Sequence, residues 1–118
     1  MAEKFKDIEG YEGYYMVSDM GNVKSLRRKK PNVPNAFIRE KILIPDKTGF
    51  VQLYKNNTSK IFHVGRLVAN AFVSNPNNYG FVGYKNKNCM DWIATNIEWI
   101  EKRFTNSSNL FNIYGKSS

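Results

Sequence analysis

A stretch in the last third of the chain combines polar and apolar residues in a way that could support chemistry. In FVGYKNKNCMDW, residues 81–92, lysines and asparagines alternate between an apolar pair, Phe81 and Val82, and Trp92. Ammonium and amide groups held between apolar residues are suited to a catalytic loop or to contact with the phosphates of a nucleic acid. The residue types alone leave both uses open.

Other side chains that commonly carry chemistry are scarce. The chain has one histidine, His63, and one cysteine, Cys89. These two cannot supply the four ligands of a zinc site, and they are too far apart in sequence to indicate a nucleophile with its base. Asp91 and Glu98 could approach each other, but a carboxylate pair drawn from ten acidic residues is weak evidence for acid–base catalysis.

The composition also bounds the compartment. A single cysteine cannot form an internal disulfide, which fits a reducing setting. No apolar run approaches the length of a membrane helix, and residues 1–4 lack the apolar region of a signal peptide. We therefore expect a cytoplasmic protein without a membrane partner.

Positive charge is concentrated in the middle of the chain. The net charge is +8, and residues 20–90 carry thirteen bases and two acids. Residues 1–19 carry two bases and five acids, and residues 91–118 carry three of each. A basic central part predicts contact with phosphates, and a charge that serves only solubility is the alternative.

The first half of the chain predicts short strands. Residues 10–26 alternate around the turn residues 19–22, which predicts a hairpin. Residues 27–35 predict a basic, exposed loop, because Pro34 removes a backbone donor and restricts Val33.

A second β region is expected to begin at residues 42–45. Within it, residues 50–54 and 60–64 predict two strands, and the polar residues 56–59 between them predict the turn of a hairpin.

The period of the apolar residues changes at Gly65. Leu67, Val68, Ala71 and Phe72 share one face of a helix, and the polar residues from position 75 end it. Further on, the sequence predicts a strand over residues 97–100. It also predicts a last helix over residues 101–113, with Phe104, Leu110 and Phe111 facing inward.

Three motifs, in this order, resemble the phage-type HNH homing endonucleases. GYEGYYMVSDMGNVKSL (10–26) resembles the NUMOD4 module, while HVGRLVANAFVSNP (63–76) and NIEWIEKRFTN (96–106) resemble the ββα-metal, or His-Me finger, nuclease core. The resemblance extends from about Lys6 to Asn112. It implies an α+β fold with short antiparallel β hairpins, a degenerate HNH-like core and two main helices. The length and the hydrophobic content of 42% predict a single domain over residues 1–118. Within it, the resemblance implies a NUMOD4-like β region at about 6–45 and the degenerate core at about 50–112.

The resemblance also indicates which residues stand at the family's catalytic positions. Gly65 replaces a family histidine, Gly83 stands at a metal-ligand position and Tyr84 at that of the general base. Thr105 stands where an asparagine completes the family's metal site. Asn96 keeps the asparagine that orients the family's histidine loop.

These replacements remove the chemistry of the family. Metal-assisted phosphodiester hydrolysis needs a base that titrates near neutral pH and a hard cation. Gly83 offers no side-chain ligand, and a phenol such as Tyr84 is only about 0.1% ionised at neutral pH. We therefore expect no catalytic residues, no metal and no other cofactor. Mg²⁺ or Mn²⁺ would be needed only if the site had moved, with His63 as base and Asn106 as ligand.

Binding to double-stranded DNA through a basic surface is then the expected function. Lys85 and Lys87 stand where the family has Ile and Gly, so the loop has gained positive charge. The expected phosphate contacts are Arg27, Arg28, Lys29, Lys30, Arg39, Lys41, Lys55, Arg66, Lys85 and Lys87.

Two alternatives remain open. The chain could be a phage regulatory or anti-defence protein that binds and inhibits a host or defence protein in the host-cell cytoplasm. Its interface anchors would then be exposed aromatics among Tyr11, Tyr14, Tyr15, Tyr79 and Tyr84. The other alternative is an active, metal-dependent HNH nicking endonuclease with relocated site residues.

Overall fold

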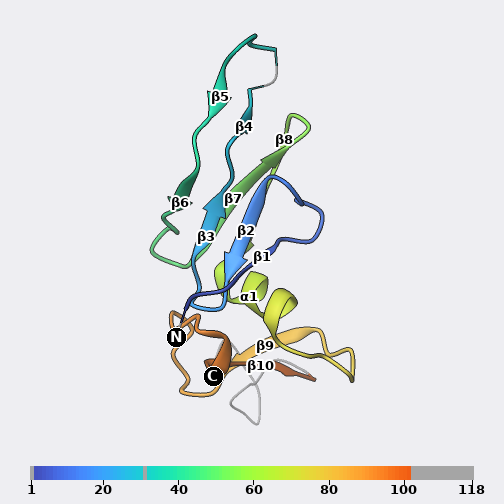
Figure 1. Cartoon of the computed structure of the whole chain (residues 1–118). Coiled ribbons are helices and arrows are strands. Elements are labelled where there is room, and N and C mark those ends of the chain that lie inside the picture. The colour runs from blue at the N-terminus through green and yellow to red at the C-terminus, as the bar shows by residue number, and fades with distance from the viewer. Residues whose placement is uncertain (1, 31, 102–118) are drawn as a thin grey trace.

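The computed structural model describes residues 2–30 and 32–101. Short strands dominate this part of the chain, together with one α-helix and one 3-10 helix (Figure 1). In chain order the elements are β1 (Phe5–Asp7), β2 (Tyr15–Ser18), β3 (Val23–Ser25), β4 (Arg28–Lys29), β5 (Phe37–Ile38), β6 (Lys41–Leu43), β7 (Phe50–Lys55), β8 (Thr58–His63), α1 (Val64–Phe72), β9 (Phe81–Tyr84), η1 (Ala94–Asn96) and β10 (Ile97–Ile100). No helix among the described residues has the length and apolar character needed to span a bilayer.

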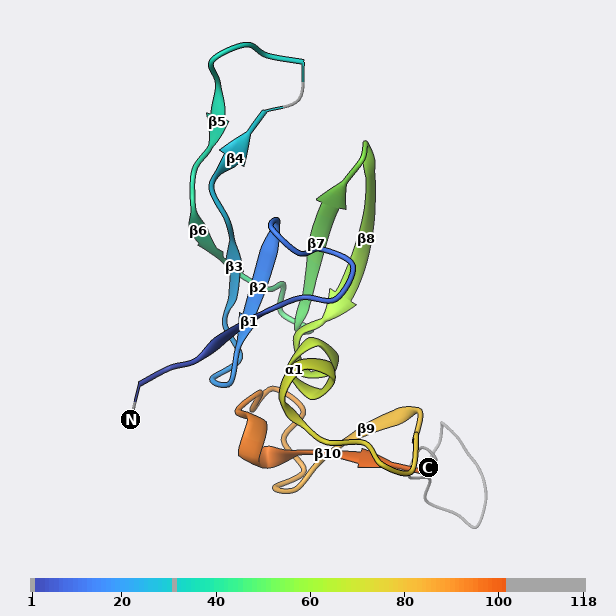
Figure 2. The ribbon, with the colours of Figure 1, turned by 45° about the vertical axis from the view of Figure 1, so that its right-hand side comes forward.

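The strands form four antiparallel groups. The largest is a sheet in the order β1-β2-β3-β6, and β7 with β8 makes a separate hairpin. β4 and β5 pair into an arm that projects from the rest of the molecule (Figure 1). Helix α1 lies between the β7–β8 hairpin and the β9–β10 pair (Figure 2). The helix therefore connects the N-terminal strands to the loop of residues 85–96.

The two predicted hairpins are confirmed. β2 pairs with β3, with Tyr15 opposite Ser25, and β7 pairs with β8 over their full lengths. Between the latter two strands, Asn56 and Asn57 have φ angles of 54° and 63°. A two-residue hairpin loop with both residues in this region matches the right-handed twist of its strands, and asparagine tolerates that conformation well.

The predicted helix and the strand at residues 97–100 are also confirmed, as α1 and β10, within a few residues of the expected bounds. Together with the hairpins they confirm an α+β fold. The second main helix was predicted over residues 101–113, which lie outside the described residues except for Glu101.

The prediction of a basic loop over residues 27–35 is wrong at its start. Arg28 and Lys29 form β4, which pairs with β5. Residues 32–35 lie in the connection of this hairpin, and Lys30 N–H donates a 2.8 Å hydrogen bond to the Ala36 carbonyl. The loop prediction failed because the partner strand has only two residues, too few to produce a sequence pattern.

The prediction that residues 42–45 open a second β region is also wrong. β6 joins the first sheet instead, with Leu43 opposite Val23. The chain leaves that sheet at Pro45, which has no backbone N–H to donate. The Asp46 carboxylate then accepts hydrogen bonds from Thr48 N–H at 2.9 Å and Phe50 N–H at 3.0 Å, which turns the chain into β7.

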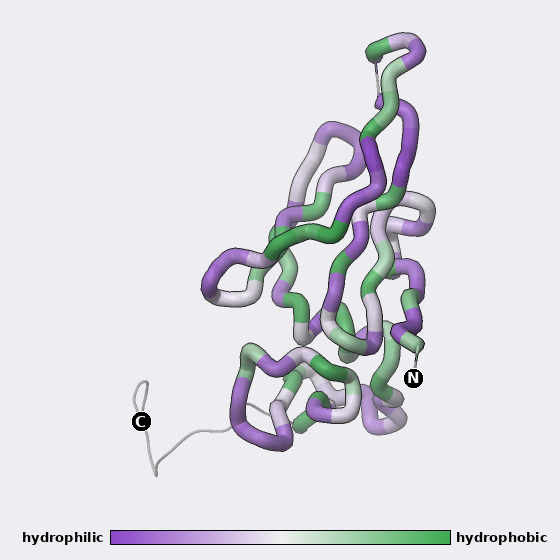
Figure 3. Tube along the Cα trace, turned by 60° about the vertical axis from the view of Figure 1, so that its left-hand side comes forward, coloured by the Kyte–Doolittle hydropathy of each residue, from purple (hydrophilic) through white to green (hydrophobic). Residues whose placement is uncertain are grey.

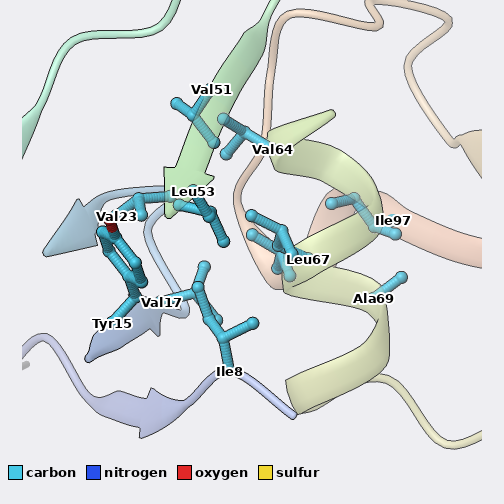
Figure 4. Packing of buried hydrophobic residues seen from close by; sticks show 11 residues of the cluster. Ile8, Tyr15, Val17, Val23, Val51, Leu53, Val64, Leu67, Ala69 and Ile97 are labelled. Atoms are coloured by element: carbon cyan, nitrogen blue, oxygen red, sulfur yellow. The ribbon is translucent and has the colours of Figure 1, made fainter. Parts of the chain in front are cut away.

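One apolar core joins the β1-β2-β3-β6 sheet, the β7–β8 hairpin, α1 and the β9–β10 pair (Figure 4). Its fully buried members come from every layer: Val17 and Val23 from the sheet, Leu53 from β7, Val64 and Val68 from α1, and Ile97 from β10. Burying an aliphatic side chain of this size contributes about 1.5–3 kcal/mol. The core therefore fixes α1 against both the N-terminal strands and the β9–β10 pair.

Trp92 provides a second connection, between the loop of residues 85–96 and the N-terminal half of the chain. A Cβ on Gly21 would lie 2.7 Å from the Trp92 Cβ, and one on Gly49 would lie 2.8 Å from its ring, so both positions have room only for glycine. The adjacent backbone is held as well, because Ala94 N–H donates to the Asp19 carbonyl at 2.8 Å. The loop of residues 85–96 is thus fixed to the turn between β2 and β3.

His63 caps the N-terminus of α1. Its Nδ1 accepts a hydrogen bond from Gly65 N–H at 3.2 Å, which satisfies one of the backbone donors that a helix start leaves unpaired. The ring packs edge-to-face against Phe50 and Trp92. Burial lowers the pKa of His63, and a backbone hydrogen bond with Thr48 and the nearby Asp46 carboxylate oppose this only in part. The capping nitrogen is therefore unprotonated in the folded protein.

The pKa of His63 predicts that the fold weakens in mild acid. Because the folded-state pKa lies below the unfolded value of about 6.5, the unfolded chain binds the proton more tightly. The contribution of neutral His63 to stability is present above pH ~6.5 and is lost as the pH falls through the folded-state pKa of this histidine. The melting temperature should be lower at pH 5 than at pH 7.5.

His63→Asn is the matched variant for this test, since asparagine can also cap a helix and the chain contains no other histidine. The decrease in melting temperature between pH 7.5 and pH 5 should be smaller in the variant. An equal decrease in both proteins would contradict the role assigned to His63.

Candidate functional site

The loop of residues 85–96 is held by a chain of hydrogen bonds. The Asn96 side chain bridges its two ends: Oδ1 accepts from Asn86 N–H at 3.0 Å, and Nδ2 donates to the Asp91 carbonyl at 3.0 Å. Asn86 Nδ2 donates to the Asp91 carboxylate at 2.8 Å, and Asn86 Oδ1 accepts from Asn88 N–H at 2.8 Å. These contacts give the loop a defined shape, and the Asn96 side chain holds its two ends together.

Gly83 lies in β9 opposite Glu98 of β10. A Cβ at this position would lie 3.0 Å from a methyl carbon of Ile100. The space beside the backbone, which a ligand side chain would need, is thus taken by hydrocarbon. The contact with Ile100 could not be predicted from sequence, because this diagonal contact depends on the register of β9 and β10.

Tyr84 packs over the first turn of α1. A Cβ built on Gly65 would overlap the Tyr84 hydroxyl and would lie 2.9 Å from Cζ of its ring. The hydroxyl is 3.4 Å from His63 Nδ1, beside the helix cap. Gly65 and Tyr84, which are 19 positions apart, therefore share one space, and a side chain at position 65 would have to displace the tyrosine.

The position of Tyr84 makes its phenol a poorer base than an ordinary tyrosine. Burial, with a smaller contribution from Cys89, raises the pKa of Tyr84 to about 12. At neutral pH only about one phenol in 10⁵ is then ionised.

His63, predicted as a relocated base, is also engaged. Its Nδ1 accepts the helix-cap hydrogen bond, and its Nε2 lies against Gly49, where a Cβ would be only 2.7 Å away. Both ring nitrogens thus face the protein. These contacts favour a structural role for the ring over proton transfer to or from a substrate.

The metal ion that the resemblance implies does not fit the described residues. A divalent ion needs several oxygen or nitrogen ligands that converge on one point. Gly83 supplies no side chain, and Tyr84 faces His63. Nowhere in residues 2–30 and 32–101 do three His, Cys, Asp or Glu side chains gather so that they could hold a metal ion. Thr105 and Asn106, the other predicted positions, lie outside these ranges.

Three of the ten predicted DNA contacts are occupied by the protein itself. The Arg28 guanidinium donates to the carbonyls of Leu26 at 2.8 Å and Tyr14 at 3.1 Å, and it stacks on the Tyr15 ring. Lys55 Nζ donates to the Gly10 carbonyl, and Arg66 donates to the Gly80 carbonyl, both at 2.8 Å. These three cations support the fold.

The remaining cations are available to a ligand. Arg27 lies over the Phe37 ring at 4.1 Å. Among the described residues, the other six side chains make no recorded hydrogen bond or ion pair with protein groups, and all are exposed: Lys29, Lys30, Arg39, Lys41, Lys85 and Lys87. The first four belong to the β4–β5 arm or its base, which Figure 3 shows as largely hydrophilic. The other two lie on the loop of residues 85–96.

A groove between the arm and the tip of the β7–β8 hairpin adds to the arm's basic character. Lys29, Lys30 and Lys55 line it together with Asn56 and Asn57. Ammonium and amide groups of this kind are suited to the phosphates and sugars of a nucleic acid backbone.

The tyrosines predicted as anchors for a protein partner are not exposed. Tyr15 is buried, and Tyr11, Tyr14, Tyr79 and Tyr84 are half-buried. Several exposed apolar side chains lie elsewhere, along a groove between β6 and the β7–β8 hairpin, among them Ile42, Ile44, Phe50 and Ile61. Partly covered rings present less surface to a partner, and the choice of these tyrosines as anchors stays a prediction.

Comparison with known proteins shows what this chain is similar to. Residues 3–49 match the NUMOD4 motif. The chain is 34% identical to DNA endonuclease I-HmuI of Bacillus phage SP01 over 102 residues, which cover 85% of this chain and 53% of that protein. It is also 34% identical to the uncharacterized HNH endonuclease L245 of Acanthamoeba polyphaga mimivirus over 101 residues, 84% of this chain and 27% of the relative.

A solved structure gives the same relationship. The structure described as DNA binding and cleavage by the HNH homing endonuclease I-HmuI superimposes with a TM-score of 0.63 at 32% identity, covering 82% of this chain and 52% of that one. The chain thus spans about half the length of I-HmuI. Residues 3–49 thus match the NUMOD4 motif, and the chain is similar in sequence and fold to about half of the HNH homing endonuclease I-HmuI.

Proposed function

We propose that this chain, of phage origin, binds double-stranded DNA in the host cytoplasm without cleaving it. The observation that carries the proposal is the packing of Tyr84 over Gly65, which fills the space at the predicted catalytic positions with a phenol that stays protonated. Ile100 supports the same conclusion beside Gly83. The structural relative I-HmuI is described as a DNA-binding and DNA-cleaving protein, which supports DNA as the partner.

The cations left free by the fold support the binding half of the proposal. Among the ten predicted contacts, four free cations follow the arm, and two stand on the loop of residues 85–96, which the resemblance aligns with the family's catalytic loop. Contacts to phosphates from these side chains would give affinity with little sequence preference, since phosphates carry no sequence information. If all six meet phosphates, log K should fall against log[salt] with a slope of about −5.

Replacing the two arm lysines tests the DNA-binding surface. Lys29→Gln with Lys30→Gln should reduce the steepness of the salt dependence by about 2, because each lost phosphate contact removes about 0.9. Fluorescence anisotropy with a labelled duplex at 50–200 mM salt measures both affinity and slope.

The matched control removes the same charge from lysines that already contact the protein. Lys6 donates to the Ala71 carbonyl at 3.1 Å, and Lys24 is paired with Glu40 at 3.9 Å. Lys6→Gln with Lys24→Gln should change the slope less than the arm variant does. Equal slopes in the two double variants would indicate a general charge effect, and no binding at 50 mM salt would refute the proposal.

A nicking assay tests the absence of cleavage. Supercoiled plasmid incubated with the protein and Mg²⁺ or Mn²⁺ should remain supercoiled under conditions in which the DNA is bound. Nicking that is lost in His63→Ala would instead establish the alternative of a relocated active site. The same assay in the presence of a chelator shows whether any nicking depends on the metal.

The packing of Tyr84 over Gly65 can be tested by its effect on stability. Alanine is favoured over glycine within a helix by about 1 kcal/mol, yet Gly65→Ala should destabilise this protein because the new methyl group meets the tyrosine. In a Tyr84→Ala background the same substitution should become neutral or stabilising. Urea unfolding of the wild type, the two single variants and the double variant gives the coupling free energy between positions 65 and 84. Additive changes in the free energy of unfolding would show that the two positions are independent.

The alternative of a host or defence protein as partner remains a prediction. Of the tyrosines expected to anchor such a partner, Tyr15 is buried and the other four are half-buried. Substitutions that test this alternative therefore belong in the exposed apolar groove between β6 and β7–β8, at Ile44 or Ile61.

A further inference from the structure

The backbone at Lys87 has a positive φ angle, which elsewhere among the described residues occurs only at glycine and asparagine. Among the described residues, positive φ angles occur at four glycines, at five asparagines and at Lys87, whose φ is 64°. Glycine has no Cβ to clash in this left-handed region, and the asparagine side chain can bond locally to offset the clash. Lysine has neither property, so its conformation is held at a cost in stability.

The surrounding loop enforces this conformation. Lys87 N–H donates to the Tyr84 carbonyl at 2.9 Å, which closes a turn over residues 84–87. The preceding residue, Asn86, is held as well. Its backbone N–H donates to Asn96, and its side chain is hydrogen-bonded to Asp91 and to Asn88 N–H. The direction in which residue 87 leaves the backbone is thus fixed before any ligand binds.

Nothing recorded within the described protein compensates for the cost. Lys87 is exposed, and its ammonium makes no recorded ion pair or hydrogen bond there, while the carboxylate of Asp91 is bound by the Asn86 amide. Glycine or asparagine at position 87 would keep the turn at a lower cost. A residue that breaks a local rule without a structural gain indicates a functional constraint.

We propose that residues 84–88 form a preorganised phosphate-binding turn, in which Lys87, supported by Lys85, contacts a phosphate of the DNA backbone. This inference rests on the proposed function and specifies one of its contacts. A phosphodiester is the ligand that fits, because two ammonium groups two residues apart on a rigid, exposed turn present positive charge and donors without any acceptor partner. A lysine fixed in direction also loses less freedom on binding than one on a mobile loop.

Three variants at position 87 separate the charge from the backbone conformation. Lys87→Gly removes both the charge and the steric cost, Lys87→Gln removes only the charge, and Lys87→Arg keeps both. Asn78→Gly is the matched conformational control, since Asn78 has a φ of 57° in an exposed turn of its own. Each full-length protein is measured for melting temperature and for duplex affinity at 50–200 mM salt.

Lys87→Gly should raise the melting temperature by about 2–5 °C while reducing the steepness of the salt dependence by about 0.9. Lys87→Gln should show the same reduction in slope without the gain in stability, and Lys87→Arg should match the wild type in both. Asn78→Gly should leave the slope unchanged and alter the melting temperature less than Lys87→Gly does.

Two results would overturn the inference while leaving the proposed function intact. The first is wild-type affinity and slope in both Lys87→Gly and Lys87→Gln. The second is a melting temperature for Lys87→Gly at or below that of Lys87→Gln. Absence of duplex binding by the wild type at 50 mM salt would refute the proposed function itself, together with the phosphate contact.

Discussion

The close approach of Tyr84 to Gly65 is the constraint on which the second half of this structure depends. It brings the end of β9 onto the first turn of α1, beside the nitrogen of His63 that caps the helix. The same histidine packs against Trp92, whose ring and Cβ require glycine at positions 49 and 21. Three glycines, one histidine and two aromatic rings thus hold the loop of residues 85–96, the helix and the N-terminal sheet together. A larger residue at any of these glycines would separate parts that are far apart in sequence.

The fold divides the basic residues into two groups with different uses. Arg28, Lys55 and Arg66 donate to backbone carbonyls, and Arg28 also stacks on aromatic rings. Such arginines and lysines act as structural cross-links between loops and strands. The exposed cations of the arm and of the loop after β9 carry no such contacts among the described residues and can exchange water for phosphate. Net charge alone overstates the binding surface, because it counts both groups.

Much of the fold could be predicted from sequence because its signals are local. The asparagine turn at residues 56–57, the alternation in β2 and the helical spacing of Leu67, Val68 and Ala71 each depend only on near neighbours. The partner of β6 and the pairing within the arm could not be predicted, because two or three residues make no periodic pattern. The positions predicted to correspond to the family's catalytic residues came from a motif, but the motif does not show the contact across 19 positions between Gly65 and Tyr84. Likewise, nothing in the sequence separates the inward Arg28 from the outward Lys29.

The shared space of Gly65 and Tyr84 also constrains which substitutions the chain can accept. A histidine at position 65 would meet the tyrosine ring, and a smaller residue at position 84 would leave an unfilled space over Gly65. Either single change gives a less stable protein. Selection on folding alone would therefore oppose a change at one of these positions that is not accompanied by a change at the other.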